Sequence, residues 1–345
     1  FAGLAVGHYF PMVESDKSLW IWLTLGYCFV AAVLPVGLLL QPRDFLSAGF
    51  LYAILGVGLV GMLLSGETIQ MPAFSGWESE KLGMLMPFLF ITVACGACSG
   101  FHSIVSSGTT SKQIKKESDV RRISYGGMLV EGVLAVFAMG CVAVLTMSER
   151  EAGGTPVGIF AAGAAKFFGA VGIPVQLGSE FAMLAISTFL LTTLDTCTRL
   201  TRFLIEELFS WRNEASRYLG TALALVLPCL LVFQQFPGAD GTLQPAWKAI
   251  WPLFGATNQL LAALALLTFV VFLKASKVGY GFALLPAVVM IVMPMTALAL
   301  MVQKFGIATL LGGTSAAMFL LGLFLMVTSW KRLTQSDAGQ LQPES

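Results

Sequence analysis

Long runs of apolar residues without charge are the feature that most constrains this chain. Several of them reach 18 residues or more, which is the length that an α-helix needs to cross a bilayer. Charged residues make up 11% of the chain and hydrophobic residues 57%, whereas soluble domains carry about 25% charged residues. Because backbone polar groups in lipid must be hydrogen-bonded internally, such runs predict helices. The chain is therefore predicted to be an all-α polytopic membrane protein.

We expect about nine transmembrane helices. Their approximate bounds are 19–40, 45–64, 83–105, 124–147, 179–198, 218–236, 249–273, 279–303 and 307–330. The segment 156–175 is also apolar, but it is short, rich in Gly and Ala, and contains Lys166. A tenth span there would invert every later loop, so we expect an outside-facing re-entrant or interfacial helix. The transmembrane domain is predicted to cover residues 1–333, followed by a polar tail at 334–345.

The distribution of basic residues predicts an orientation. If the segment before Trp20 lies outside, the inside loops hold 14 of the 20 basic residues and the outside loops hold 6. Positively charged loops remain in the cytoplasm, which predicts a cytoplasmic C-terminus. The net charge of +1 gives no reason to expect a nucleic-acid partner, and the oligomeric state is left open.

The start of the chain predicts that it is a fragment. Residues 1–12 resemble the tail of an earlier span, and the first residue is Phe1 rather than Met. They lack the basic start and cleavage site of a signal peptide. We therefore expect N-terminal spans to be missing from this sequence.

The densest polar chemistry lies at residues 94–110, in and just after the third expected span. An ionisable residue within a membrane is by default a candidate functional site, and His102 is such a residue. The candidate substrate- or ion-binding side chains of this stretch are Ser99, His102, Ser103, Ser106, Ser107, Thr109 and Thr110.

Three functions compete for this stretch, beside a purely structural His102. Cys95-x-x-Cys98 with His102 suggests a metal or redox site, but no second Cys/His pair lies at zinc-site spacing. Ser99 and His102 suggest hydrolysis, but no third orienting residue is found. The favoured interpretation is a helix that Gly96 and Gly100 break and Gly108 ends, because transporters build solute sites from broken helices. No cofactor, metal or enzymatic activity is predicted.

Polar residues in three other spans admit either a structural or a functional role. Pro35 predicts a kinked helix end with Arg43 among the lipid headgroups, or else a discontinuous helix that lines a substrate path. Glu131 is either an interfacial residue or a proton or ion site. Asn258 and Gln259, which are candidate binding residues, also suit interhelical hydrogen bonds.

A polar stripe is expected along the fifth span. Its six residues are spaced by three or four, which places them on one helical face: Thr188, Thr192, Asp195, Arg199, Arg202 and Glu206. Asp195 and Arg199 are four residues apart and are expected to pair. The pair is either a structural cap of the helix or an inner gate, with Thr192 as a binding residue.

These residues resemble the carbon starvation protein A family. The resemblance rests on five blocks, in the expected order between about 30 and 265: Val33–Pro35 with Pro42–Asp44, Pro87–Thr110, Tyr125–Glu131, Leu191–Phe203 and Trp251–Leu261. It implies a secondary transporter with the inverted-repeat fold of amino-acid/cation symporters, in a bacterial cytoplasmic (inner) membrane.

The resemblance also implies a substrate class. The family transports peptides and pyruvate, so we expect import of a small carboxylate-bearing solute with a coupling proton or cation. Glu131, Asp195 and Arg199 are the expected gating or proton-carrying residues. The alternative is a membrane sensor that binds a solute without moving it.

Overall fold

The computed structural model describes residues 16–74, 76–79, 83–211, 213–237 and 243–334, without the side chains of 79, 83, 94–97, 237, 332 and 334. The expected span remnant at 1–12 and the tail from 335 onward lie outside these residues. The chain divides into two compact units, Phe1–Ser75 with Ser118–Leu231 (unit 1) and Gly76–Glu117 with Val232–Ser345 (unit 2).

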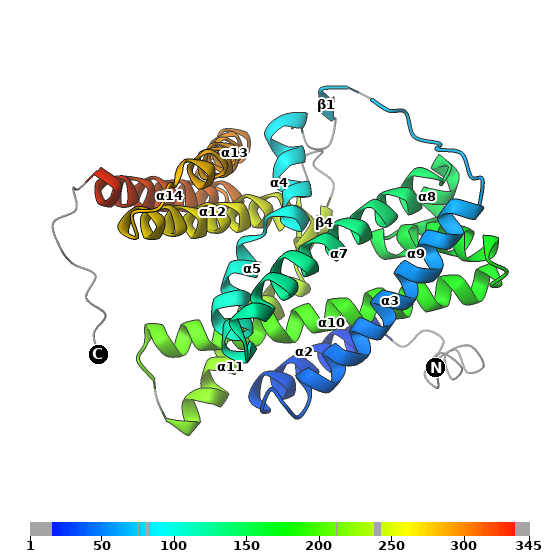
Figure 1. Ribbon diagram of the computed structural model, residues 1–345, viewed down its shortest axis with the longest axis horizontal. Helices are drawn as coiled ribbons and strands as arrows, with labels where there is room; N and C mark the ends of the chain where they lie inside the picture. Colours follow the sequence, from blue (N-terminus) through cyan, green and yellow to red (C-terminus); the bar gives the residue numbers. More distant parts are fainter. Residues whose placement is uncertain (1–15, 75, 80–82, 212, 238–242, 335–345) are drawn as a thin grey trace. The chain divides into compact units, whose positions relative to one another are not determined.

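Unit 1 consists of helices alone within its described residues. They are α2 (Lys17–Val33), α3 (Leu40–Leu64), α7 (Glu117–Ala143, whose first residue is assigned to unit 2), α8 (Met147–Gly153), α9 (Pro156–Ala170), α10 (Val175–Leu208) and α11 (Glu214–Val232) (Figure 1).

Unit 2 combines helices with two short antiparallel hairpins. Its elements are β1 (Glu78–Ser79), β2 (Gly83–Met84), α4 (Leu85–Ala97), α5 (Gly100–Val105), a π-helix (Ser106–Thr110), α6 (Ser111–Gln113), β3 (Gln235–Pro237), β4 (Leu243–Pro245), α12 (Ala246–Ala275), α13 (Gly281–Phe305) and α14 (Leu310–Thr334). Figure 1 shows α12, α13 and α14 side by side. Buried residues of α12 and α13, with Phe88 and Ile91 of α4, form the core of this unit, and partly buried residues of α14 pack against it.

Seven helices of the described residues are long and apolar enough to cross a membrane: α3, α7, α10, α11, α12, α13 and α14. This agrees with a polytopic helical membrane protein, although the expected count of nine is not confirmed. The other two expected spans are interrupted. The segment 19–40 holds α2 and an irregular stretch, and 83–105 is split between α4 and α5.

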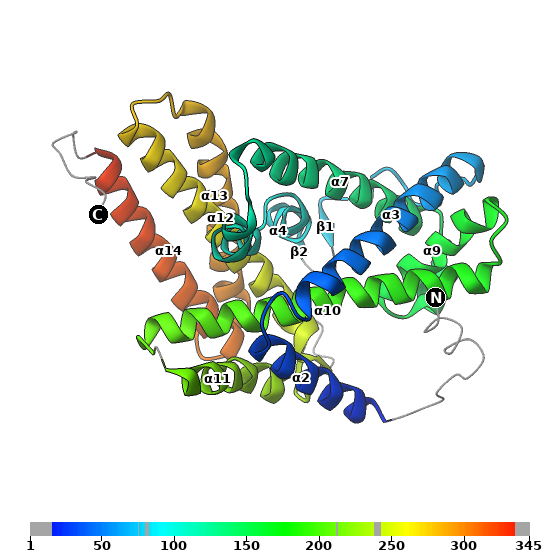
Figure 2. The ribbon, with the colours of Figure 1, turned by 60° about the horizontal axis from the view of Figure 1, so that its bottom comes forward.

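The short helix α9 is the most deeply packed element of unit 1. Thr155 caps its N-terminus and Pro156 occupies its first turn, where proline is favoured. Phe167 and Phe168 are buried among residues of α3, α7 and α10, and Figure 2 shows α9 against α3 and α10. An interfacial helix would expose one face, so this burial fits the re-entrant alternative better.

Candidate functional site

A break between α2 and α3 lies at the centre of the candidate site of unit 1. Pro35 lacks the N–H that would hydrogen-bond to the carbonyl of Ala31, four residues earlier. Leu34 has an extended backbone with ψ 152°, as expected for a residue before proline. The helix therefore ends at Val33 and resumes at Leu40, which leaves backbone carbonyls in need of donors.

Arg199 of α10 supplies those donors. Its Nη2 donates to the Ala31 carbonyl at 2.5 Å and to the Leu34 carbonyl at 2.7 Å. The Ala31 carbonyl is the one that Pro35 cannot serve. Arg199 is 4% exposed, and its Nε has no hydrogen-bond partner in the described structure. A buried guanidinium therefore takes the place of a backbone N–H at the break.

The Asp195 carboxylate lies one turn before Arg199 and is fully buried. It forms an ion pair with Arg43 of α3. The Tyr27 hydroxyl of α2 donates to Asp195 at 3.0 Å and accepts from Arg43 at 2.9 Å. Arg43 also contacts the half-exposed Asp44 at 2.8 Å. Three helices thus meet at one buried ion pair.

These contacts correct two expectations from the sequence. Asp195 pairs with Arg43 and not with Arg199, because the carbonyls of the α2 break bind the Arg199 guanidinium. Arg43 does not extend toward lipid headgroups; its side chain is 14% exposed and turned to Asp195. Sequence reasoning missed Tyr27, and the one available signal was that a lone Asp within a span requires a partner.

The charged part of the predicted polar stripe of α10 is turned toward the protein interior. Asp195, Arg199 and Arg202 are buried, and Thr192 is half-buried with its hydroxyl donating to the Thr188 carbonyl at 3.0 Å. Along α10, from its N-terminus to its C-terminus, the threonine hydroxyls come before the charged side chains.

A second helix break lies in unit 2, between Ala97 and Gly100. Asn258 of α12 closes it, because its Oδ1 accepts the Phe101 N–H at 2.8 Å and its Nδ2 donates to the Ser99 hydroxyl at 3.0 Å. A Cβ at Gly100 would lie 2.2 Å from the Asn258 carbonyl oxygen, so only glycine allows this approach. The predicted break is confirmed.

Gln259 and Asn258 make the interhelical hydrogen bonds that the sequence suggested as their structural role. The Gln259 amide donates to the Phe90 carbonyl at 3.1 Å, while its buried Oε1 has no hydrogen-bond partner within the described residues. The helix was expected to end at Gly108, and this is wrong. Gly108 lies inside the π-helix, and the helical stretch continues to Gln113.

The hydroxyls after the break bond back to their own helix. Ser103 donates to the Gly100 carbonyl at 2.6 Å and Ser106 to the Ser103 carbonyl at 2.9 Å. Ser107 and Thr109 likewise donate to Ile104 and Val105. Because the hydroxyl hydrogens are engaged, the remaining lone pairs are acceptors, which suit a cation better than a carboxylate.

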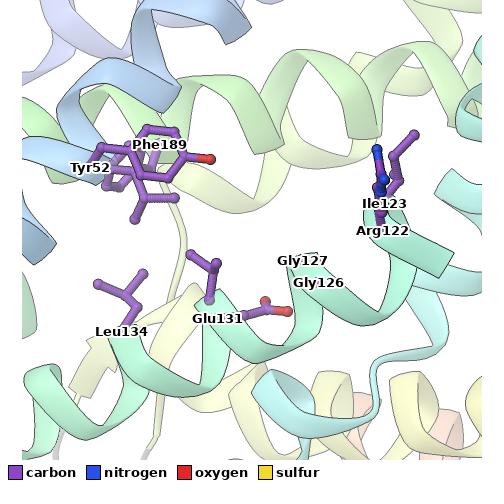
Figure 3. A pocket seen from close by; sticks show the side chains of 10 residues that line it. Tyr52, Arg122, Ile123, Gly126, Gly127, Glu131, Leu134 and Phe189 are labelled. Carbon is purple, nitrogen blue, oxygen red and sulfur yellow. The ribbon is translucent and has the colours of Figure 1, made fainter. Parts of the chain in front are cut away.

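Glu131 lines a cleft of about 760 Å³ between α3, α7 and α10. Figure 3 shows its carboxylate beside Gly126 and Gly127, whose missing side chains leave this part of α7 open. Tyr52 lines the same cleft, and Arg122 lies nine residues before Glu131, roughly 14 Å along the helix. The cleft lining does not include Asp195 or Arg199.

The predicted site residues are divided between the two units. Unit 1 holds Thr192, Glu131, Asp195 and Arg199, and unit 2 holds Ser99, His102, Ser103, Ser106, Ser107, Thr109, Thr110, Asn258 and Gln259. His102 is exposed, with its ring centroid 6.5 Å from that of Phe101. The Cys95 side chain lies outside the described residues, and the described ones contain no group of three or more metal-ligating side chains.

Apolar helices that break around buried polar contacts define a multi-pass membrane protein. Comparison with known sequences identifies the family. The family model for carbon starvation protein CstA matches residues 2–153 and 147–297. The chain belongs to the carbon starvation protein CstA family, as the five sequence blocks predicted.

Several curated relatives carry transporter names. The peptide transporter CstA of Helicobacter pylori (strain ATCC 700392 / 26695) is 33% identical over 80% of this chain and 49% of its own length. The Escherichia coli K12 peptide transporter CstA is 33% identical over 80% and 48%. The pyruvate/proton symporter BtsT of Escherichia coli K12 is 32% identical over 74% and 47%. The chain spans about half the length of these relatives, and no solved structure matches it.

Proposed function

We propose that this chain is part of a secondary active transporter that imports a small carboxylate-bearing solute, either a peptide or pyruvate, with a proton or another cation. The observation that carries the proposal is the buried Arg43–Asp195 pair at the break between α2 and α3. Ionisable side chains within spans are costly to bury and by default mark functional sites. The position of this pair at a discontinuous helix is where transporters hold substrates and coupling ions.

Asp195 would be the proton-carrying residue and Arg43 its gate partner. Protonation of Asp195 would remove the charge that holds Arg43, since a neutral carboxyl no longer balances the guanidinium. The Tyr27 hydroxyl bridges both groups and would follow the change. Arg199 would keep the free carbonyls of α2 satisfied while the pair opens, so that α2 and α3 can move about the break.

The hydroxyl cluster of unit 2 would bind the coupling cation. The hydroxyl hydrogens of Ser106, Ser107 and Thr109 are engaged within the helix, so these oxygens offer acceptors, which favours a cation over a carboxylate. Thr110 is the next residue of this cluster. A π-helix often marks a functional site. His102 and Ser103 would stand beside the ion, and Ser99 with Asn258 and Gln259 would hold the break that positions it.

The proposal includes the inner membrane of a bacterium, an inverted-repeat architecture and a cytoplasmic C-terminus. The seven apolar helices and the names of the relatives support the membrane location, and the bias of basic loops supports the cytoplasmic C-terminus. The inverted repeat rests on the family resemblance. The cleft at Glu131 supports a second polar station on the path, because it combines a carboxylate with Tyr52 and Arg122.

The experiment is uptake of labelled pyruvate or dipeptide by the reconstituted full-length protein, with and without a proton gradient. Asp195→Asn should abolish gradient-driven uptake, while Asp44→Asn, which changes the exposed partner of the same arginine, should retain it. His102→Ala should reduce uptake at unchanged expression. Binding of solute without accumulation in liposomes would replace the transporter by a sensor. Normal gradient-driven uptake by Asp195→Asn would remove Asp195 from the coupling.

A further inference from the structure

A second pocket of unit 1, outside the proposed path, lies where α10 and α11 diverge next to their connecting turn. It has a volume of about 340 Å³, which is within the range of small-ligand sites. Its lining includes two arginines, Arg202 and Arg217, and two glutamates, Glu206 and Glu214. Arg202 packs closely against α11, because a Cβ at Gly220 would lie 3.1 Å from Cγ of Arg202.

The pocket offers donors to a phosphate. Arg202 is 5% exposed, and its Nε lies 3.8 Å from Glu206, beyond hydrogen-bond distance, without a hydrogen-bond partner in the described structure. Arg217 adds a second guanidinium to the lining. The N-terminus of the 19-residue helix α11 also opens here at Glu214, and helix N-termini favour anions.

The same pocket offers acceptors to an ammonium group. Glu206 and Glu214 bring two carboxylates, so the formal charges of the four ionised lining residues cancel. A simple anion would meet repulsion from those carboxylates, whereas a zwitterion would satisfy both signs. A primary ammonium donates three hydrogen bonds, which a quaternary ammonium cannot do.

The surroundings of the pocket are those of a membrane surface. The pocket lies at the ends of two membrane-spanning helices, in a loop that the basic residues predict to be cytoplasmic. Trp211 lines it and stacks on Phe209 with ring centroids 5.1 Å apart; aromatic rings of this kind lie at the headgroup level. Leu204 and Tyr218 are more than half exposed near the pocket and offer apolar surface to acyl chains.

We propose that this pocket binds the phosphoethanolamine head group of an inner-leaflet phospholipid. The phosphate would contact Arg202 and Arg217, and the ammonium would contact Glu206 and Glu214. Pockets between transmembrane helices on the cytoplasmic side bind lipid head groups, and the two carboxylates here, which balance the two arginines, select an amine-bearing one. The proposal does not depend on transport.

The test is native mass spectrometry of the full-length protein in detergent, titrated with phosphatidylethanolamine, phosphatidylcholine or phosphatidylglycerol of identical acyl chains. Phosphatidylethanolamine should be retained on the order of tenfold better than phosphatidylcholine, as expected for one charge-assisted hydrogen bond. Glu214→Gln should remove that preference. Arg217→Gln should weaken retention of both lipids, and Arg121→Gln, an exposed basic control on α7, should change neither.

Three results would overturn the proposal. Equal retention of the ethanolamine and choline lipids would remove the role of the carboxylates. Stronger retention of phosphatidylglycerol would make the pocket a general anionic-lipid surface. Binding of soluble phosphoethanolamine or inorganic phosphate as tight as that of the lipid would make it a metabolite site. Because the variants change exposed residues and no uptake is measured, failure here leaves the proposed transport function unaffected.

Discussion

The two helix breaks of this protein satisfy their backbone by different chemistry. At the break between α2 and α3, charged side chains do so: Arg199 serves two carbonyls and Arg43 meets Asp195 across the gap. At the break between α4 and α5, the neutral carboxamide of Asn258 serves the Phe101 N–H. The first arrangement contains ionisable groups, whereas the second uses a carboxamide, which does not titrate.

The largest loss of stability is expected when the Arg43–Asp195 ion pair is broken. Asp195→Asn removes the buried carboxylate that faces Arg43, while the contact with the half-exposed Asp44 remains, which should lower the free energy of unfolding by about 3–5 kcal/mol. Adding Arg43→Gln removes the second charge and should restore most of that stability but not uptake. Thermal unfolding in nanodiscs measures both. If the double variant is as unstable as the single one, the two residues do not act as a pair.

The next effect tests whether Arg199 replaces the N–H that Pro35 lacks. Arg199→Met leaves the Ala31 and Leu34 carbonyls buried without donors, at a cost of about 2–4 kcal/mol. Pro35→Ala allows α2 to continue and supplies a backbone donor to Ala31, so the arginine change should cost less in that background. A double-mutant cycle measures this coupling. Additive costs would contradict the substitution of one donor for the other.

A smaller effect is expected at the neutral break. Asn258→Ala removes the cap of α5 and should lower the free energy of unfolding by about 1–2 kcal/mol, as for loss of a helix N-cap. The loss should be the same at pH 5 and pH 8, because a carboxamide does not titrate. Asp195→Asn, by contrast, removes an ionisable side chain from the charged break. A pH-dependent cost at Asn258 would erase the contrast between the breaks.

The smallest effect concerns a charged contact outside the spans, at α8. The hydrogen bond from Lys166, and then those from the Thr146 hydroxyl and N–H, lower the pKa of Glu149 to about 2. Since the folded pKa lies below the unfolded value, the contribution of Glu149 is present above about pH 4.5. It should be lost as the pH falls toward 2. Glu149→Gln should flatten this part of the stability–pH curve, which thermal unfolding between pH 6 and pH 3 measures; an unchanged curve would contradict it.

The sequence predicted the elements of unit 1 better than their partners. Apolar runs predicted the helices, and the spacing of Thr192, Asp195 and Arg199 predicted that they share one helical face. Both predictions use only the order of nearby residues. The pairing of Asp195 was wrong for the same reason. The rule for residues four apart on a helix contains no information on distant segments. Here the proline break about 160 residues earlier provides the carbonyls that bind Arg199, and the helix after it provides the arginine that pairs with Asp195.

In unit 2, the glycines predicted where the helix would break but not how far it would continue. Gly96 and Gly100 bracket the break that the structure shows between Ala97 and Gly100. Gly108 was expected to end the helix, yet it lies within a π-helix, where Ser107 and Thr109 donate hydrogen bonds to the Ile104 and Val105 carbonyls of the preceding turn. The roles of Asn258 and Gln259 at the break required knowledge of the facing helix.

The close packing of α9 has a mechanical consequence. A Cβ at Gly61 would lie 2.0 Å from the Phe167 carbonyl, and one at Gly163 would lie 1.9 Å from the Cys141 carbonyl. Because the backbones are in contact at both points, α9 cannot slide against α3 or α7. These three segments are therefore expected to move as one rigid body. Any motion of α2 relative to this rigid body would then require backbone rotations in the six residues from Leu34 to Leu39, which connect α2 to α3.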